Sequence, residues 1–140
     1  MNKKRIIIII LILGIIGAFV AYKMYNKPHV DVADTKSDIV LTADKIQSDF
    51  STNESEANTK YLEKIIEVSG DISEITIEKE KGIITLKTND DFGSVLCHLS
   101  DESTQKMNTL NIGKTVTLKG ICTGYLMDVI LVKCEIINYN

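Results

Sequence analysis

The chain has 140 residues, enough for one domain of ordinary size. Its net charge of −3 is unevenly distributed along the chain. Residues 1–27 carry five basic residues and no acid, whereas residues 28–140 carry 11 lysines and 19 acids, a net charge of −8. An acidic region without arginine, the usual residue for gripping phosphate, argues against a surface that binds nucleic acid.

The N-terminus has a short basic head followed by a long apolar run. Residues 1–5 hold Lys3, Lys4 and Arg5, and Ile6–Tyr22 then passes without a charge. This run is at the lower limit for a membrane-spanning helix of roughly 20 residues. We therefore expect a cytoplasmic head at residues 1–5 and a transmembrane signal anchor over residues 6–25.

Two membrane arrangements compete. A cleaved signal peptide would favour small residues two positions apart, whereas Ala18 and Ala21 stand three apart. The basic head favours an N-terminus that stays in the cytoplasm. The sequence thus predicts a single-pass protein of the cytoplasmic (inner) membrane whose domain is extracytoplasmic. Secretion after signal-peptide cleavage is the alternative.

Residues 26–40 are polar and predict a linker, and residues 41–62 predict two short helices. Thr42 is suited to cap the first helix, and Asn53 is suited to cap the second. From Ile65 onward the apolar residues alternate, which is typical of strands. A shift of phase near Gly70–Glu74 indicates a bend or bulge in a long first strand.

Four more strands follow, over residues 83–88, 93–99, 114–122 and 128–137, with a helix over residues 101–110 that Ser100 can cap. This order predicts a mainly β fold, a five-stranded OB-fold barrel over residues 65–138 with its helix between the third and fourth strands. The domain would then cover residues 41–140. The rival arrangement is an open five-stranded sheet with helices on one face.

Several stretches carry a family resemblance. Residues 113–124 and 128–136 show a Lys-Gly-x-Cys-x-Gly pattern and then Asp-Val-x-Leu-x-x-Cys, after the runs Ile65–Ile72 and Val95–Leu99. Over about residues 41–138 the chain resembles the tRNA-anti-like family of bacterial OB-fold proteins, many of them described as lipoproteins. The resemblance implies an OB fold and membrane association, and it implies no particular activity. No cysteine follows the apolar run, so the acylation site of the lipoprotein members is missing.

Cys97, Cys122 and Cys134 all fall on apolar faces of predicted strands, where cysteine packs as a small hydrophobic residue. If the last two strands form a hairpin, Cys122 and Cys134 are roughly 13 Å apart, too far to bridge. The third and fifth strands of an OB barrel are neighbours. Cys97 and Cys134 are therefore the best-placed pair for a disulfide in an oxidising compartment.

The sequence offers no catalytic, metal or cofactor site that outweighs a structural interpretation. His98 adjoins Cys97 but points to the opposite face of its strand, and no Cys-x-x-Cys occurs. The acid pairs Asp90-Asp91 and Asp101-Glu102 lie at predicted turns, where acids commonly cap elements. We expect no catalytic residue, no metal and no cofactor, and the chain is not predicted to be an enzyme.

The sequence is most consistent with a membrane-tethered OB-fold module that binds an envelope protein or a small molecule. Candidate contacts are Tyr125 and Met127 in the last turn and the lysines Lys87 and Lys119 on the strands. Single-stranded nucleic acid is the alternative ligand. It would need stacking aromatics in a basic groove, and the predicted strands carry almost none. An envelope enzyme is the weakest alternative.

Overall fold

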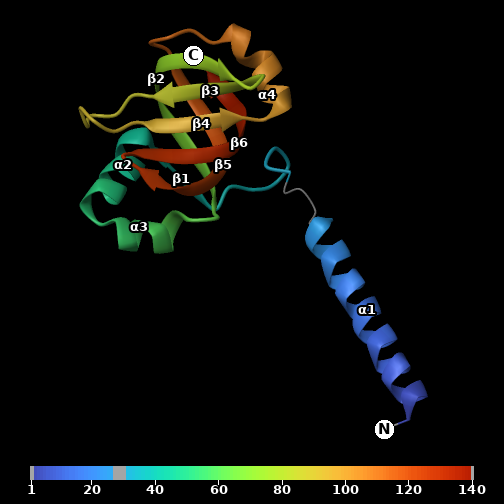
Figure 1. Ribbon diagram of the computed structural model, residues 1–140. Helices are drawn as coiled ribbons and strands as arrows, with labels where there is room; N and C mark the ends of the chain where they lie inside the picture. Colours follow the sequence, from blue (N-terminus) through green and yellow to red (C-terminus); the bar gives the residue numbers. More distant parts are fainter. Residues whose placement is uncertain (1, 27–30, 140) are drawn as a thin grey trace. The chain divides into compact units, whose positions relative to one another are not determined.

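The structure is a computed structural model that describes residues 2–26 and 31–139, so the predicted linker residues 27–30 lie outside it. The described chain forms two units, an N-terminal helix and a compact domain that begins at Asp31 (Figure 1).

Helix α1 runs from Lys3 to Tyr25, so it begins within the predicted head and ends where the predicted anchor ends. Its 23 residues rise about 34 Å, enough for a hydrocarbon core of about 30 Å. None of its residues is buried, and apolar side chains are exposed all around it. By length and composition α1 is a candidate membrane span, which is consistent with the predicted anchor.

The domain is a mainly β barrel with short helices. In chain order its elements are β1 (Ile39–Thr42), α2 (Ala43–Thr52), α3 (Glu54–Tyr61), β2 (Ile65–Glu78), β3 (Lys81–Leu86), β4 (Val95–Leu99), α4 (Asp101–Lys106), the 3-10 helix η1 (Met107–Thr109), β5 (Thr115–Leu126) and β6 (Asp128–Tyr139). The five predicted strands are β2 to β6, and α4 is the predicted helix between the third and fourth of them.

The sheet closes because β2 serves two neighbours. Its residues 65–71 pair antiparallel with β5, and its residues 72–78 pair antiparallel with β3. The register shifts between Ile72 and Glu74, which confirms the predicted bend. The remaining order is β3-β4-β6-β5, with β4 and β6 parallel. This closure confirms the OB-fold barrel, and the rival open sheet is wrong.

All three predicted helix caps are present. The side chains of Thr42, Asn53 and Ser100 accept hydrogen bonds from backbone N–H groups three residues later, at Lys45, Glu56 and Ser103. Such caps satisfy donors that the first helical turn leaves free. The capped helices pack on the barrel, whose core is lined by inward-facing side chains such as Ile66, Val68, Ile84, Leu86, Val95, Leu118, Val129 and Leu131.

Part of the predicted linker belongs to the domain. Residues 39–42 form β1, which pairs parallel with residues 66–69 of β2. Ahead of β1, Val32 is buried, and Asp38 exchanges two hydrogen bonds with the backbone of Ile65, at 2.8 and 3.0 Å. The domain therefore begins about ten residues before the predicted boundary at residue 41, because these polar residues find backbone partners on the barrel.

Candidate binding surface

The outer face of β3 and β4 is partly open to solvent. Ile83 and Thr85 on β3 lie opposite His98 and Leu96 on β4, and all four side chains are half-buried. Because side chains alternate along a strand, the neighbours of these residues point into the core. We call these four residues the β3–β4 face.

None of the described helices covers this face. Helices α2 and α3 pack on β1, β2, β5 and β6. Helix α4 and η1 approach Gly82 and Leu99 from the buried side, since a Cβ at Gly82 would lie 2.6 Å from the sulfur of Met107. Figure 1 shows β3 and β4 uncovered between the two groups of helices. The surface that many OB folds use for binding is thus free.

The predicted contacts Tyr125 and Met127 lie in and beside the β5–β6 turn. Tyr125 is half-buried, and its ring stacks on Phe50 of α2 with centroids 5.3 Å apart. Met127 is 66% exposed, and its φ of 67° lies in the left-handed region. Tyr125 therefore supports the turn from within the domain, whereas Met127 points to solvent and can reach a partner.

The two predicted lysine contacts differ. Lys87 is exposed just after β3 and lines a shallow polar depression with Asp71 and Asn89. Lys119 is only 8% exposed, and its Nζ donates hydrogen bonds to the carbonyl oxygens of Ala33 and Thr35, at 3.0 and 2.9 Å. Lys119 therefore holds residues 31–38 against β5 and has no free ammonium group to offer a ligand.

The three cysteines are buried and free. The thiols of Cys97 and Cys134 lie close enough to interact. Burial is the main cause that raises the pKa of the Cys134 thiol, and the contact with Cys97 raises it further. Burial likewise raises the pKa of Cys122 to about 11. Thiols of raised pKa are poor nucleophiles, so neither Cys122 nor Cys134 resembles a catalytic cysteine. The pairing of Cys97 with Cys134 in a disulfide stays a prediction.

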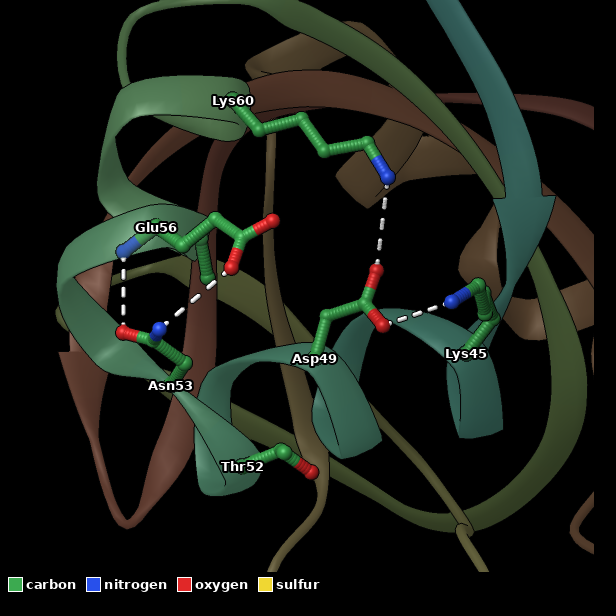
Figure 2. A pocket seen from close by; sticks show the side chains of 7 residues that line it. Lys45, Asp49, Thr52, Asn53, Glu56 and Lys60 are labelled. Carbon is green, nitrogen blue, oxygen red and sulfur yellow. Dashed lines mark hydrogen bonds and ion pairs between the residues drawn. The ribbon is translucent and has the colours of Figure 1, made fainter.

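A small polar pocket of about 220 Å³ lies between α2 and α3 (Figure 2). Lys45 and Lys60 point toward the carboxylate of Asp49, at 2.6 and 3.5 Å, and the Tyr61 hydroxyl donates to the same group. Burial raises the pKa of Asp49, but the hydrogen bonds from Lys45 and Tyr61 and the two lysine charges outweigh it and lower this pKa below its usual value. Because Lys60 and Tyr61 of α3 both contact Asp49 of α2, this network fastens α3 to α2.

Sequence reasoning missed two residues near the β5–β6 turn. Gln47 of α2 is 1% exposed, and Phe92, between β3 and β4, is 82% exposed. The stripe Ala43, Ile46, Gln47, Phe50 has helical spacing, so Gln47 could have been placed on the buried face of α2. Within the described residues, no group of three or more His, Cys, Asp or Glu side chains could hold a metal ion.

Comparisons with known proteins agree with this architecture. A family model described as tRNA_anti-like matches residues 1–136. The chain belongs to the tRNA_anti-like family. The match begins 40 residues before the region 41–138 that carries the resemblance, and it includes the whole of α1. No curated protein sequence matches the chain.

The fold of the chain is similar to that of solved structures with TM-scores of 0.50 and above. A Klebsiella pneumoniae subsp. pneumoniae MGH 78578 protein, named a "putative nucleic acid-binding lipoprotein", has a TM-score of 0.61 at 18% identity, covering 79% of this chain and 99% of its own. A "putative aspartyl-tRNA synthetase" from Leishmania major Friedlin has a TM-score of 0.50 at 12% identity, covering 89% and 26%. The S. pombe Stn1–Ten1 complex has a TM-score of 0.43 at 16% identity, covering 53% and 58%.

The position of Lys119 predicts the effect of its removal. In Lys119→Met the two carbonyl groups lose their donor, so residues 31–38 should exchange their amide hydrogens faster while β2 to β6 keep their protection. Hydrogen exchange followed by mass spectrometry measures both regions. Lys114→Met, at an exposed side chain near the start of β5, is the matched control. Unchanged exchange over residues 31–38 would contradict the assigned role.

The lowered pKa of Asp49 predicts a pH-dependent contribution to stability. The ionised carboxylate stabilises the fold above its unfolded-state value near 3.8, and this contribution is lost as the pH falls through the folded-state pKa. Asp49→Asn should therefore lower the free energy of unfolding by about 1–2 kcal/mol at pH 7 and much less near pH 3.

Urea unfolding followed by tyrosine fluorescence measures this difference. Glu56→Gln is the matched control: Glu56 lines the same pocket outside the ion pairs with Asp49, and glutamine keeps an oxygen for the hydrogen bond from Asn53, so the loss of stability at pH 7 should be smaller than in Asp49→Asn. An equal loss of stability in Asp49→Asn at both pH values would show that the charge of Asp49 contributes nothing.

Proposed function

We propose that the chain is a single-pass, membrane-tethered binding module whose OB-fold domain works outside the cytoplasm and binds a protein of the cell envelope. The observation that carries the proposal is the uncovered β3–β4 face. The apolar helix α1 and the basic residues before and at its start support the tether and its direction.

A protein fits this face better than a small molecule does. Small-molecule sites are concave and mostly apolar, whereas the β3–β4 face is a strand surface on which apolar Ile83 and Leu96 stand at diagonal positions, beside His98 and Thr85. The pockets described between α2 and α3 and beside Lys87 are polar and lie elsewhere. An outward apolar strand surface without a covering helix is the kind of surface that a protein partner buries.

Single-stranded nucleic acid is the second candidate, and one observation favours it: the similar Klebsiella protein is named as binding nucleic acid. The charge of this chain opposes it. The segment after residue 27 carries a net −8 and no arginine, and Lys119 is occupied by backbone carbonyls. Ile83 and Leu96 also stand where stacking aromatics would be needed.

The proposed topology predicts which positions a membrane-impermeant maleimide can reach in intact cells. Ser55→Cys lies at an exposed position of α3 and should be labelled, while Asn2→Cys should be labelled only after the membrane is opened. The native cysteines are buried and give a low background. Labelling of Asn2→Cys together with protection of Ser55→Cys would reverse the topology, and loss of α1 from the mature protein would show cleavage.

The β3–β4 face can be tested by photo-crosslinking. The photoreactive amino acid p-benzoylphenylalanine at position 96 of the full-length chain should form adducts with protein in intact cells. The same substitution at Thr59, an exposed residue of α3, is the control and should form few. Adducts with nucleic acid from position 96 would favour the second candidate. No adduct from position 96 beyond the control would remove support for binding by this face.

A further inference from the structure

Three large apolar side chains are exposed together at one end of the barrel. Phe92, Leu126 and Met127 are 82%, 80% and 66% exposed. They come from the β3–β4 loop and the β5–β6 turn, which meet where a Cβ at Gly93 would lie 3.0 Å from the Met127 carbonyl oxygen. We call these three residues the apolar tip. Single exposed apolar residues are ordinary, but a cluster of them marks a surface that binds.

The two loops that carry the apolar tip are fixed to each other. The buried Gln47 donates from Nε2 to the Met127 carbonyl oxygen at 3.0 Å and to an Asp90 carboxylate oxygen at 3.4 Å. The backbone N–H and hydroxyl of Ser94 both donate to Asp128 Oδ1, at 2.8 and 2.7 Å. A surface held in place before binding loses little conformational entropy when a partner arrives.

Met127 has a conformation that does not suit its residue type. The left-handed region, with φ near 67°, is adopted at hairpin turns by Gly or Asn at little cost, whereas an unbranched apolar side chain gains nothing there. The Met127 side chain is exposed, so burial of apolar surface does not offset the cost of this backbone conformation. Four other described non-glycine residues also have a left-handed φ, but all four carry charged side chains: Glu63, Lys79, Glu80 and Lys133. Met127 combines this conformation with an exposed apolar side chain, and that combination supports a role outside the fold.

The charges around the apolar tip select its partner. Asp90 and Asp91 precede Phe92, Asp128 follows Met127, and no lysine lies in residues 88–94 or 126–128. Lys45 of α2 lines a depression together with Asp90, so Asp91 and Asp128 are the carboxylates of the two loops away from that lysine. These carboxylates would repel anionic lipid headgroups and nucleic acid. They complement lysine or arginine on a partner, and the flexible thioether of Met127 adapts to apolar side chains.

We propose that the apolar tip and its aspartates dock a protein segment that combines apolar side chains with lysine or arginine. This inference rests on the proposed function and names the partner chemistry for it. The tip is continuous with the β3–β4 face, because β4 starts directly after the loop and Leu96 lies beside Ile130, four residues beyond Leu126. The same partner can thus contact both surfaces.

The test uses the full-length chain in nanodiscs of zwitterionic lipid, with empty nanodiscs as background. The probes are synthetic peptides of four compositions: leucine with lysine, leucine with glutamate, serine with lysine, and glycine with serine. The leucine–lysine peptide should bind best. Phe92→Ser and Asp91→Lys should each weaken that binding by about tenfold, and salt should reduce the effect of Asp91→Lys. Ile112→Ser, at a residue 65% exposed on the loop before β5, is the control and should bind normally.

Met127→Gly separates a binding role from a structural one. Glycine relieves the left-handed conformation, so the unfolding temperature should stay equal or rise while the affinity for the leucine–lysine peptide falls. A lower unfolding temperature with unchanged affinity would show that Met127 serves the fold and would overturn the proposal.

Other outcomes distinguish this inference from the proposed function. Equal binding of the four peptides, or equal losses in Phe92→Ser and Ile112→Ser, overturns the apolar tip as a docking site. So does photo-crosslinking from position 92 to lipid in place of peptide. If position 96 still forms protein adducts in cells, the proposed function stands without the tip. If neither position 92 nor position 96 traps a protein, both fail.

Discussion

The bend in β2 is the constraint on which the rest of the domain depends. One strand pairs with β5 over its first half and with β3 over its second half, and only this double pairing turns a row of strands into a closed barrel. The bend also lets a helix approach the barrel closely at Gly70, where a Cβ would lie 3.0 Å from that of Ala43 at the start of α2. Closure and helix packing therefore share one short stretch of chain.

The features that the sequence predicts well are those with a local physical cause. Thr42, Asn53 and Ser100 cap helices because each side chain reaches an N–H group only three residues away. The slip in alternation after Gly70 reports the bulge directly, since a bulged strand must change which residues face the core. From these local signals the order of elements, and hence the OB fold, follows with few alternatives.

Lys119 shows why the rest could not be predicted. Alternation along β5 places it outside the barrel, as expected, because Leu118 points into the core. Whether that outer position is exposed depends on which segment covers it. Residues 31–38 cover it, and their sequence has no apolar periodicity from which this could be predicted. Their contacts are backbone hydrogen bonds between segments far apart in sequence, which composition does not encode. The ammonium group of Lys119 thus binds carbonyl oxygens of the same chain.

At the end of the barrel around Met127, several residues occupy positions that do not suit their residue type. In most of the domain residue types suit their places: caps lie at helix starts, and apolar side chains fill the core. Met127 at the β5–β6 turn has a left-handed φ, and Phe92 in the β3–β4 loop is exposed to solvent. Gln47 of α2, which contacts both loops, keeps one buried side-chain oxygen without a described partner. Natural sequences tolerate such conflicts mainly where function requires them. Single exposed apolar residues such as Ile77 and Ile112 and single left-handed residues such as Lys133 occur elsewhere, but near Met127 several such features lie on two loops that contact each other, which is why this end is the one we propose to bind a partner.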